Sequence, residues 1–135
     1  MKITEYLLGL PDFIAYFAVA CVLLAAFAFV YTRLTPHHEW QLIRQNVPAA
    51  AVAFGGSLIG FTLPLHSAIS HSVNIVDCAL WGVIALVVQL ITFAVIRRFI
   101  PNISERIANN EMASGIFVAA ASISVGLLNA ASMSY

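Results

Sequence analysis

Charged residues are scarce in this sequence, and their scarcity excludes most soluble proteins. Only 9% of the 135 residues are Asp, Glu, Lys or Arg, whereas 61% are hydrophobic. A soluble domain has about 25% charged residues, and so short a chain has no core large enough to bury this much apolar surface. The composition therefore predicts an integral membrane protein. The formal net charge is zero, which removes the electrostatic basis for binding nucleic acid.

Catalytic and cofactor-binding motifs are also missing. The sequence has no P-loop, nucleophile elbow, zincin motif, Rossmann glycine pattern or potassium-filter TVGYG. His37, His38 and Glu39 are adjacent, but neighbours on a helix diverge by about 100° and do not converge on one ion. We therefore predict no enzymatic activity, no cofactor and no metal site.

Buried charge and paired cysteines are lacking as well. No Asp, Glu, Lys or Arg is evident within the apolar runs, which argues against a proton-coupled carrier. The two cysteines, Cys21 and Cys78, lie in or beside apolar runs. We interpret both as small buried hydrophobic residues rather than as a disulfide or metal pair.

The sequence does contain long apolar runs. A helix of about 20 apolar residues crosses the roughly 30 Å hydrocarbon layer and satisfies its own backbone hydrogen bonds there. The sequence therefore predicts an all-α integral membrane protein that forms one domain over residues 1–135. Its four transmembrane helices are expected at about Phe13–Tyr31, Pro48–Ser70, Val76–Ile96 and Met112–Met133.

The basic residues predict the orientation of these spans. The first and third connectors carry Arg33, Arg44, Arg97, Arg98 and Arg106, and the second carries no Lys or Arg. The positive-inside rule then places connectors one and three in the cytoplasm and both termini in the periplasm. Tyr31 and Trp40 are expected at the inner membrane interface, where such rings concentrate.

The chain also contains a predicted internal repeat. A shift of 64 residues places Asn46 on Asn110 and Ala49 on Ala113. Each half reads as a span, an arginine, a proline, a short amphipathic stretch, an asparagine and a second span rich in alanine and glycine. We expect two tandem two-helix repeats, about 10–70 and 76–134, related by an axis along the membrane normal.

The two arginine-bearing connectors are expected to be short amphipathic helices in the headgroup layer. Thr35 is predicted to cap the first of them, with Pro36 at its first position. Asn102 and Glu105 are predicted to form a capping box on the second. These helices anchor the chain to the membrane, or offer Trp40 and its neighbours to a cytoplasmic protein partner.

Small residues mark the second and fourth spans as packing elements. Lipid tails do not drive apolar helices together, so helix association in a membrane depends on small residues that let two backbones approach closely. These two spans are the expected centre of a bundle or a homo-oligomer, and the first and third are expected to face lipid. The predicted packing residues are Gly56, Gly60, Ser122 and Gly126.

Polar residues within the spans suggest a cavity. An unpaired amide at Gln89 is costly in the membrane, so its side chain is expected to reach Ser57, Ser122 or Ser124. Pro64 removes a backbone donor one turn after Gly60 and is expected to kink the helix. These residues serve either helix packing or a solute path. The candidate cavity lining is Ser57, Thr62, Pro64, His66, Ser67, Gln89 and Asn129.

Four stretches carry a resemblance to a known family: YTRLTPHHEWQLI, AFGGSLIGFTLPL, WGVIALVVQL and LLNAASMSY. In this order they resemble the YjfL-like bacterial inner-membrane proteins, the family of domain of unknown function 350. The resemblance implies a four-span inner-membrane protein with an internal duplication. It supplies no activity, although relatives encoded near envelope-stress proteins imply envelope maintenance. Position 66 is usually small and polar in this family, so His66 departs from its pattern.

Taken together, these observations predict a homo-oligomeric, non-enzymatic envelope protein of the bacterial inner membrane, in contact with membrane lipid. Two alternatives remain open at this point. The first is a channel or small-solute pathway through the polar cavity. The second is a membrane scaffold that recruits cytoplasmic partners to the amphipathic connectors.

Overall fold

A computed structural model describes residues 3–35 and 38–133 of the chain, and every regular element in these residues is a helix. Four stretches are long and apolar enough to cross a membrane: the first joins α1 and α2, and the others are α4, α5 and α7. The prediction of an all-α protein with four spans is therefore confirmed. The helices are α1 (Ile3–Leu8), α2 (Leu10–Leu34), α3 (Glu39–Arg44), α4 (Pro48–His71), α5 (Ile75–Phe99), α6 (Ile103–Ala108) and α7 (Met112–Ser132).

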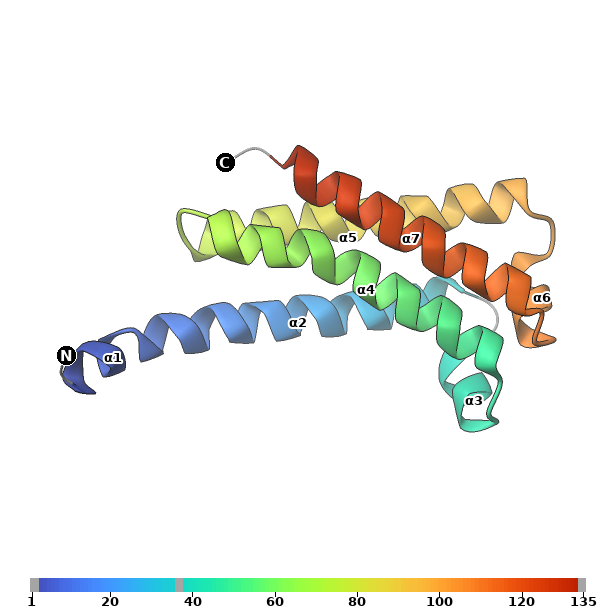
Figure 1. The fold of residues 1–135 in the computed structure, drawn as a ribbon, viewed down its shortest axis with the longest axis horizontal. Coiled ribbons are helices and arrows are strands. Elements are labelled where there is room, and N and C mark those ends of the chain that lie inside the picture. The colour runs from blue at the N-terminus through green and yellow to red at the C-terminus, as the bar shows by residue number, and fades with distance from the viewer. Residues whose placement is uncertain (1–2, 36–37, 134–135) are drawn as a thin grey trace.

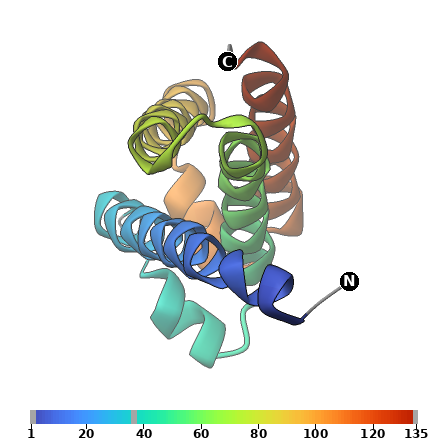
Figure 2. The ribbon, with the colours of Figure 1, turned by 90° about the vertical axis from the view of Figure 1, so that its left-hand side faces the viewer.

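The short helices α3 and α6 lie at one end of the molecule, which we call the connector end (Figure 1). Helix α1, the α4–α5 turn and the end of α7 lie toward the other, the terminal end. Helices α4 and α7 run side by side in both views and make the most extensive contact in the fold (Figures 1 and 2). The first half of α2 diverges from the bundle, together with α1 (Figure 1).

Helix α4 is the centre of the bundle. We compare the most apolar 18 residues of each span. Of these residues, 56% are buried in α4, compared with 33% in α5, 28% in α7 and 11% in the first span. Both even-numbered spans were expected at the centre of a bundle or of an oligomer, and within the bundle this is right for α4. Helix α7 packs on α4 through one face of small residues, while Ile116, Phe117, Leu127 and Leu128 on its other faces are exposed in this single chain. A central place for α7 in an oligomer stays a prediction.

Aromatic rings fill the space between α2, α4 and α5. The Phe27 and Phe61 rings stack with centroids 4.8 Å apart. The Tyr31 ring meets Phe93 edge-on at 5.4 Å and tilts against Phe54 at 5.8 Å. All five side chains are buried. This cluster holds the second half of α2 on the bundle.

Thr35 does not cap α3, whereas Asn102 occupies the N-cap of α6 but without the predicted capping-box hydrogen bond. Thr35 ends α2, where its N–H bonds to the Tyr31 carbonyl, and it does not begin α3. Pro36, its predicted companion, lies outside the described residues. Asn102 precedes α6 in the left-handed conformation and its side chain makes no cap bond. A capping box needs an extended backbone at the N-cap residue, which directs its side chain toward the helix N–H groups. Tertiary packing instead holds the Asn102 backbone in the left-handed conformation.

The two connectors have matching backbones. His38 and Asn102, which precede α3 and α6, have φ angles of 42° and 57°. Asn46 and Asn110, which follow them, have φ angles of 63° and 60°. Both pairs are 64 residues apart. Asn and His are the residue types that tolerate this left-handed region best after glycine.

The connector helices pack against the bundle as well as facing outward. On α6, Ile103 and Ile107 are buried on one face. On α3, the Trp40 side chain is 52% exposed, yet its ring meets Phe54 edge-on with centroids 5.1 Å apart. Asn110 adds a polar link, because its Oδ1 accepts the backbone N–H of Ala49 in the first turn of α4 at 3.1 Å.

The two cysteines differ in environment. Cys78 is buried, as expected, but Cys21 is exposed on α2. The expectation of a buried Cys21 was wrong because Cys21 lies on the outward side of α2, whereas Ala20, Leu23 and Leu24 beside it pack on the bundle. Apolar sequence alone does not distinguish a lipid-facing side from a protein-facing one.

Candidate functional site

The contact between α4 and α7 is closed by glycines, and we call it the α4–α7 seam. A Cβ added at Gly56 would overlap Ala119 on α7. At Gly60 it would overlap the Ser122 carbonyl, and at Gly126 the Gly60 carbonyl. Each of these three glycines therefore lies where another backbone approaches too closely for any side chain.

Pro64 explains part of this seam. In a helix the Gly60 carbonyl accepts from the N–H of residue 64, but proline has none. The freed carbonyl faces Gly126, whose Cα–H groups are weak donors of the kind that recur at close helix contacts. Helix α4 nevertheless continues through Pro64 to His71, and Pro64 is buried against its neighbours.

A row of buried polar side chains crosses the bundle, with one residue from each long helix. It consists of Tyr31, Ser57, Gln89 and Ser122, each at most 3% exposed, and we call it the polar row. Ser57 Oγ lies 3.1 Å from Tyr31 Oη, 3.4 Å from Ser122 Oγ and 3.0 Å from the Ala53 carbonyl. Ser57 Oγ has one proton, which it donates either to the Tyr31 hydroxyl or to the Ala53 carbonyl.

Gln89 completes the polar row from α5. Its Nε2 donates to the Ser122 carbonyl at 3.1 Å, so Ser122 is the partner among the three serines considered from sequence. Its Oε1 is buried and has no hydrogen-bond partner among the described residues. The Gln89 amide thus joins α5 to the α4–α7 seam next to Gly60, near which its Nε2 lies.

The residues predicted to line one polar cavity fall into three places. Ser57 and Gln89 are in the polar row, and Pro64 is buried in α4. Thr62 and His66 are exposed on the opposite face of α4, and the Thr62 hydroxyl donates to the Leu58 carbonyl at 2.7 Å.

Ser67 and Asn129 occupy the third place, at the terminal end of the α4–α7 seam. Both are half-buried, and Ser67 Oγ donates to the Ala130 carbonyl at 3.4 Å. The Asn129 Nδ2 atom is buried without a hydrogen-bond partner among the described residues. The Ser67 hydroxyl thus joins the ends of α4 and α7, one helical turn or more beyond the polar row.

Sequence reasoning missed two polar groups near the connector end. Tyr31, expected at the interface, is 2% exposed and belongs to the polar row. Its spacing of four residues from Phe27 places both rings on one helix face and was the available signal. Glu39 is fully buried, and its Oε1 accepts the Thr35 hydroxyl. No sequence pattern distinguished this glutamate from an exposed one at the start of a helix.

The arrangement is that of a helix bundle held by close backbone contacts and internal hydrogen bonds. Its polar row is packed among side chains of all four spans, and within residues 3–35 and 38–133 no group of three His, Cys, Asp or Glu side chains is placed to hold a metal ion. These features define a polytopic α-helical membrane protein.

The chain belongs to a family described as Domain of Unknown Function 350, whose profile matches residues 5–133. It is 44% identical over 135 residues, the full length of both chains, to the "UPF0719 inner membrane protein YjfL" of Escherichia coli strains K12 and O157:H7. It is 31% identical over 122 residues to the "UPF0719 transmembrane protein YshE" of Bacillus subtilis, covering 87% of this chain and 88% of the relative. No solved structure matches. The resemblance inferred from sequence is confirmed, and the relatives' names attach no enzymatic activity.

Proposed function

We propose that this protein is a non-enzymatic, homo-oligomeric component of the bacterial inner membrane that serves the cell envelope. The supporting observation is Gly55. It is the one glycine at which an added Cβ would meet no atom of the described residues within 4 Å. Glycine in a helix costs about 1 kcal/mol relative to alanine, and packing inside one chain gives no reason for that cost. Close approach of a second copy supplies the reason.

The side chains around Gly55 point to the same conclusion. Thr62 and His66 lie seven and eleven residues further along α4, on the same helix face, and both are exposed. We call this surface, with Gly55, the outer face of α4. Polar side chains within membrane spans normally face other protein groups and not lipid. A second copy packed along this face removes Thr62 and His66 from lipid and uses the space left by Gly55.

A leucine at Gly55 tests this proposal. Because one chain has room there, Gly55→Leu is expected to leave the folded protomer intact and to reduce the oligomer to monomers in mild detergent, measured by native mass spectrometry. Ala120→Leu is the matched control, since Ala120 is exposed on α7 and is expected to leave the oligomer unchanged. Oligomers of wild-type size from Gly55→Leu would contradict the proposal.

We further infer that the connector end is cytoplasmic and that both termini are periplasmic. Five of the six basic residues gather at that end: Arg33, Arg44, Arg97, Arg98 and Arg106. The positive-inside rule supports this orientation. An alkaline phosphatase fused after Tyr135 is expected to be active, because that enzyme functions only in the periplasm. Activity of a cytoplasmic reporter at the same position would reverse the assignment.

The two halves of the chain are inferred to be tandem repeats. The support is that α3 and α6 are six residues each and start at Glu39 and Ile103, 64 residues apart. The left-handed residues on either side of them share the same offset. Parallel repeats of this kind are related by an axis along the membrane normal, which suits a protein whose two helix pairs enter from the same side.

A small-solute pathway is the second candidate function, and the exposure of Thr62 and His66 favours a path between subunits over one inside a protomer. In liposomes of the oligomer, ion or solute flux is expected to fall when His66 is replaced by leucine. Equal flux through His66→Leu and the wild type would count against this candidate.

A scaffold is the third candidate, and the exposed part of Trp40 favours it. Trp40→Ala is expected to lose a cytoplasmic partner that cross-links to the wild type in cells, while Trp81→Ala, changed at the other end of the bundle, keeps it. Unchanged cross-linking in Trp40→Ala would rule out recruitment through α3.

A further inference from the structure

Two cavities at the connector end share the Arg97 side chain. The first is a polar compartment of about 280 Å³, lined by Arg97, Asn102, Ile103, Ser104 and Glu105. The second is an apolar compartment of about 190 Å³ between α2 and α5, lined by Tyr31, Leu34, Thr35, Leu90, Phe93, Ala94 and Arg97. A polar compartment and an apolar one are therefore both lined by Arg97.

The polar compartment offers groups that lack partners. Arg44 and Arg106 donate to backbone carbonyls and Arg33 covers the Phe29 ring. Arg97 and Arg98, in contrast, make no hydrogen bond or ion pair with another described residue, and of these two only Arg97 lines the compartment. The Ser104 hydroxyl is buried and likewise has no partner among the described residues. An arginine and a hydroxyl without partners suit a phosphate, which guanidinium binds in a bidentate manner.

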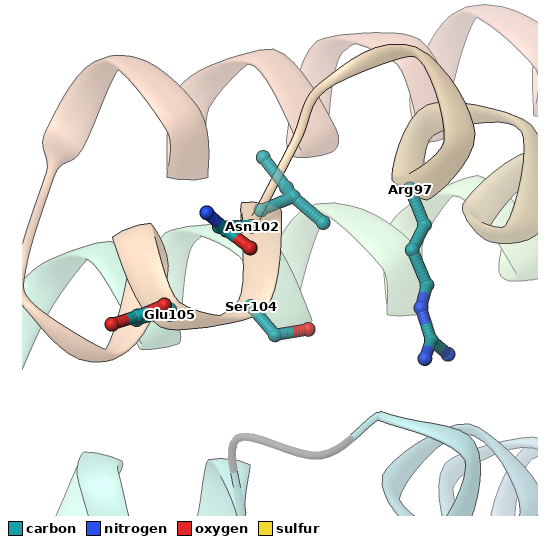
Figure 3. A pocket seen from close by; sticks show the side chains of 5 residues that line it. Arg97, Asn102, Ser104 and Glu105 are labelled. Carbon is teal, nitrogen blue, oxygen red and sulfur yellow. The ribbon is translucent and has the colours of Figure 1, made fainter.

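Opposite charges stand at the two ends of this compartment. In Figure 3 the Ser104 hydroxyl points toward Arg97, whereas the Glu105 carboxylate lies on the other side and points away from it. No ion pair joins Arg97 to Glu105 within the described residues. A ligand that carries both a phosphate and an amine matches this lining, since the phosphate pairs with Arg97 and the ammonium with Glu105. A purely anionic headgroup would leave Glu105 as a repulsive neighbour.

The apolar compartment specifies the rest of the ligand. It opens beside Arg97 where α2 and α5 end, at the boundary of the membrane spans. Leu34, Leu90 and Ala94 line it with apolar groups that favour a hydrocarbon chain. We propose that the two compartments together bind one phospholipid of the adjoining leaflet, with a phosphoethanolamine-type headgroup at Arg97, Ser104 and Glu105 and an acyl chain between α2 and α5.

Lipid titration of the full-length protein in detergent tests this site. Native mass spectrometry measures binding of phosphatidylethanolamine, phosphatidylcholine and phosphatidylglycerol with identical acyl chains. The wild type is expected to bind phosphatidylethanolamine most tightly. Arg97→Gln is expected to weaken that binding at least about tenfold, the effect of losing one charge-assisted hydrogen bond. Glu105→Gln is expected to remove the preference over phosphatidylglycerol.

Two neighbouring residues provide matched controls. Arg98 and Glu111 are exposed at the same end of the protein and line neither compartment. Arg98→Gln and Glu111→Gln are therefore expected to bind all three lipids as the wild type does. If Arg98→Gln weakens binding as much as Arg97→Gln, diffuse charge attraction explains the data and the site is refuted.

A further arm distinguishes a lipid from a free phosphate compound. Ala94→Phe fills the apolar compartment at an exposed position and is expected to weaken phospholipid binding. Soluble O-phosphoethanolamine and inorganic phosphate are expected to bind far more weakly than the lipid. If either binds as tightly as the lipid, or Ala94→Phe retains wild-type lipid affinity, the proposal of a lipid site is overturned.

Discussion

The inner and outer faces of α4 carry similar residues but have different surroundings. On the inner face, Gly56 and Gly60 touch α7 so closely that no Cβ fits. On the outer face, a Cβ added at Gly55 would meet no atom of the described residues within 4 Å, and Thr62 and His66 are exposed. Gly55 and Gly56 are adjacent in sequence and about 100° apart on the helix. The comparison teaches that composition identifies a close-packing helix, while only the neighbouring helices reveal which glycines pack within one chain.

The largest expected effect comes from a bulky residue on the inner face. Gly60→Leu would drive its side chain into the Ser122 backbone and is expected to destabilise the protomer by more than about 3 kcal/mol, because backbone cannot yield as a side chain does. Unfolding by a denaturing detergent, followed by circular dichroism, measures this loss. Gly55→Leu, on the outer face, is the control. Equal stability of the two variants would contradict the claim that only the inner face is closely packed within one chain.

A smaller loss is expected where the α4–α7 seam begins. Asn110→Gly removes the side-chain acceptor of the Ala49 N–H but permits the left-handed backbone. Loss of such a helix cap costs about 1 kcal/mol. The same unfolding assay measures it, with Asn109→Gly as the control at an exposed neighbour. A variant as stable as the wild type would mean that water replaces the Asn110 amide.

The polar row is expected to contribute less. Tyr31→Phe removes the hydroxyl that reaches Ser57 while the ring packing is kept. Hydrogen bonds between membrane helices contribute about 0.6 kcal/mol on average, so a loss of that size is expected in unfolding. Tyr16→Phe, a half-buried tyrosine elsewhere on α2, is the control. A loss above about 2 kcal/mol would indicate cooperative bonding along the row.

The smallest effect on the protomer is expected on the outer face. Thr62→Val keeps the side-chain shape and removes a hydroxyl that bonds only to the Leu58 carbonyl of its own helix among the described residues. The protomer's free energy of unfolding is expected to change by less than about 0.5 kcal/mol. A loss comparable to that of Gly60→Leu would show that the outer face is required for folding of the protomer.

Long-range patterns in the sequence predicted more than local motifs did. The four apolar runs marked the spans, because crossing lipid demands length and hydrophobicity that no other element needs. The predicted cap at Thr35 and the predicted capping-box hydrogen bond at Asn102 failed, because a cap depends on the backbone angles on both sides of one residue. Cys21 was misjudged for a related reason: in a lipid-soluble chain, apolar character does not separate the core from the lipid-facing surface.

The candidate cavity residues illustrate the same division. Gln89 could be assigned a buried partner from sequence, since an amide in mid-membrane must find one. Thr62 and His66 lie on a different helix face from Ser57, but the sequence did not show which of the two faces packs inside the bundle. Glu39 and Tyr31 were missed because their burial depends on where α3 and α2 pack against α4. The spacing of Tyr31 from Phe27 was a signal for one shared face, but no pattern around Glu39 indicated its burial.

By itself, the sequence determined that this protein is a four-span membrane protein of the family with domain of unknown function 350, because hydrophobic length and full-length similarity depend only on the order of residues. The tertiary structure alone decided which face of α4 is buried, that one polar residue from each span meets in a row, and that Arg97 lines both a polar and an apolar compartment. The physical reason is that these features arise from the rotation and approach of helices about one another. The apolar pattern alone does not determine how far each helix is rotated or how closely it approaches its neighbours. In this chain, close backbone contacts and hydrogen bonds between helices determine both.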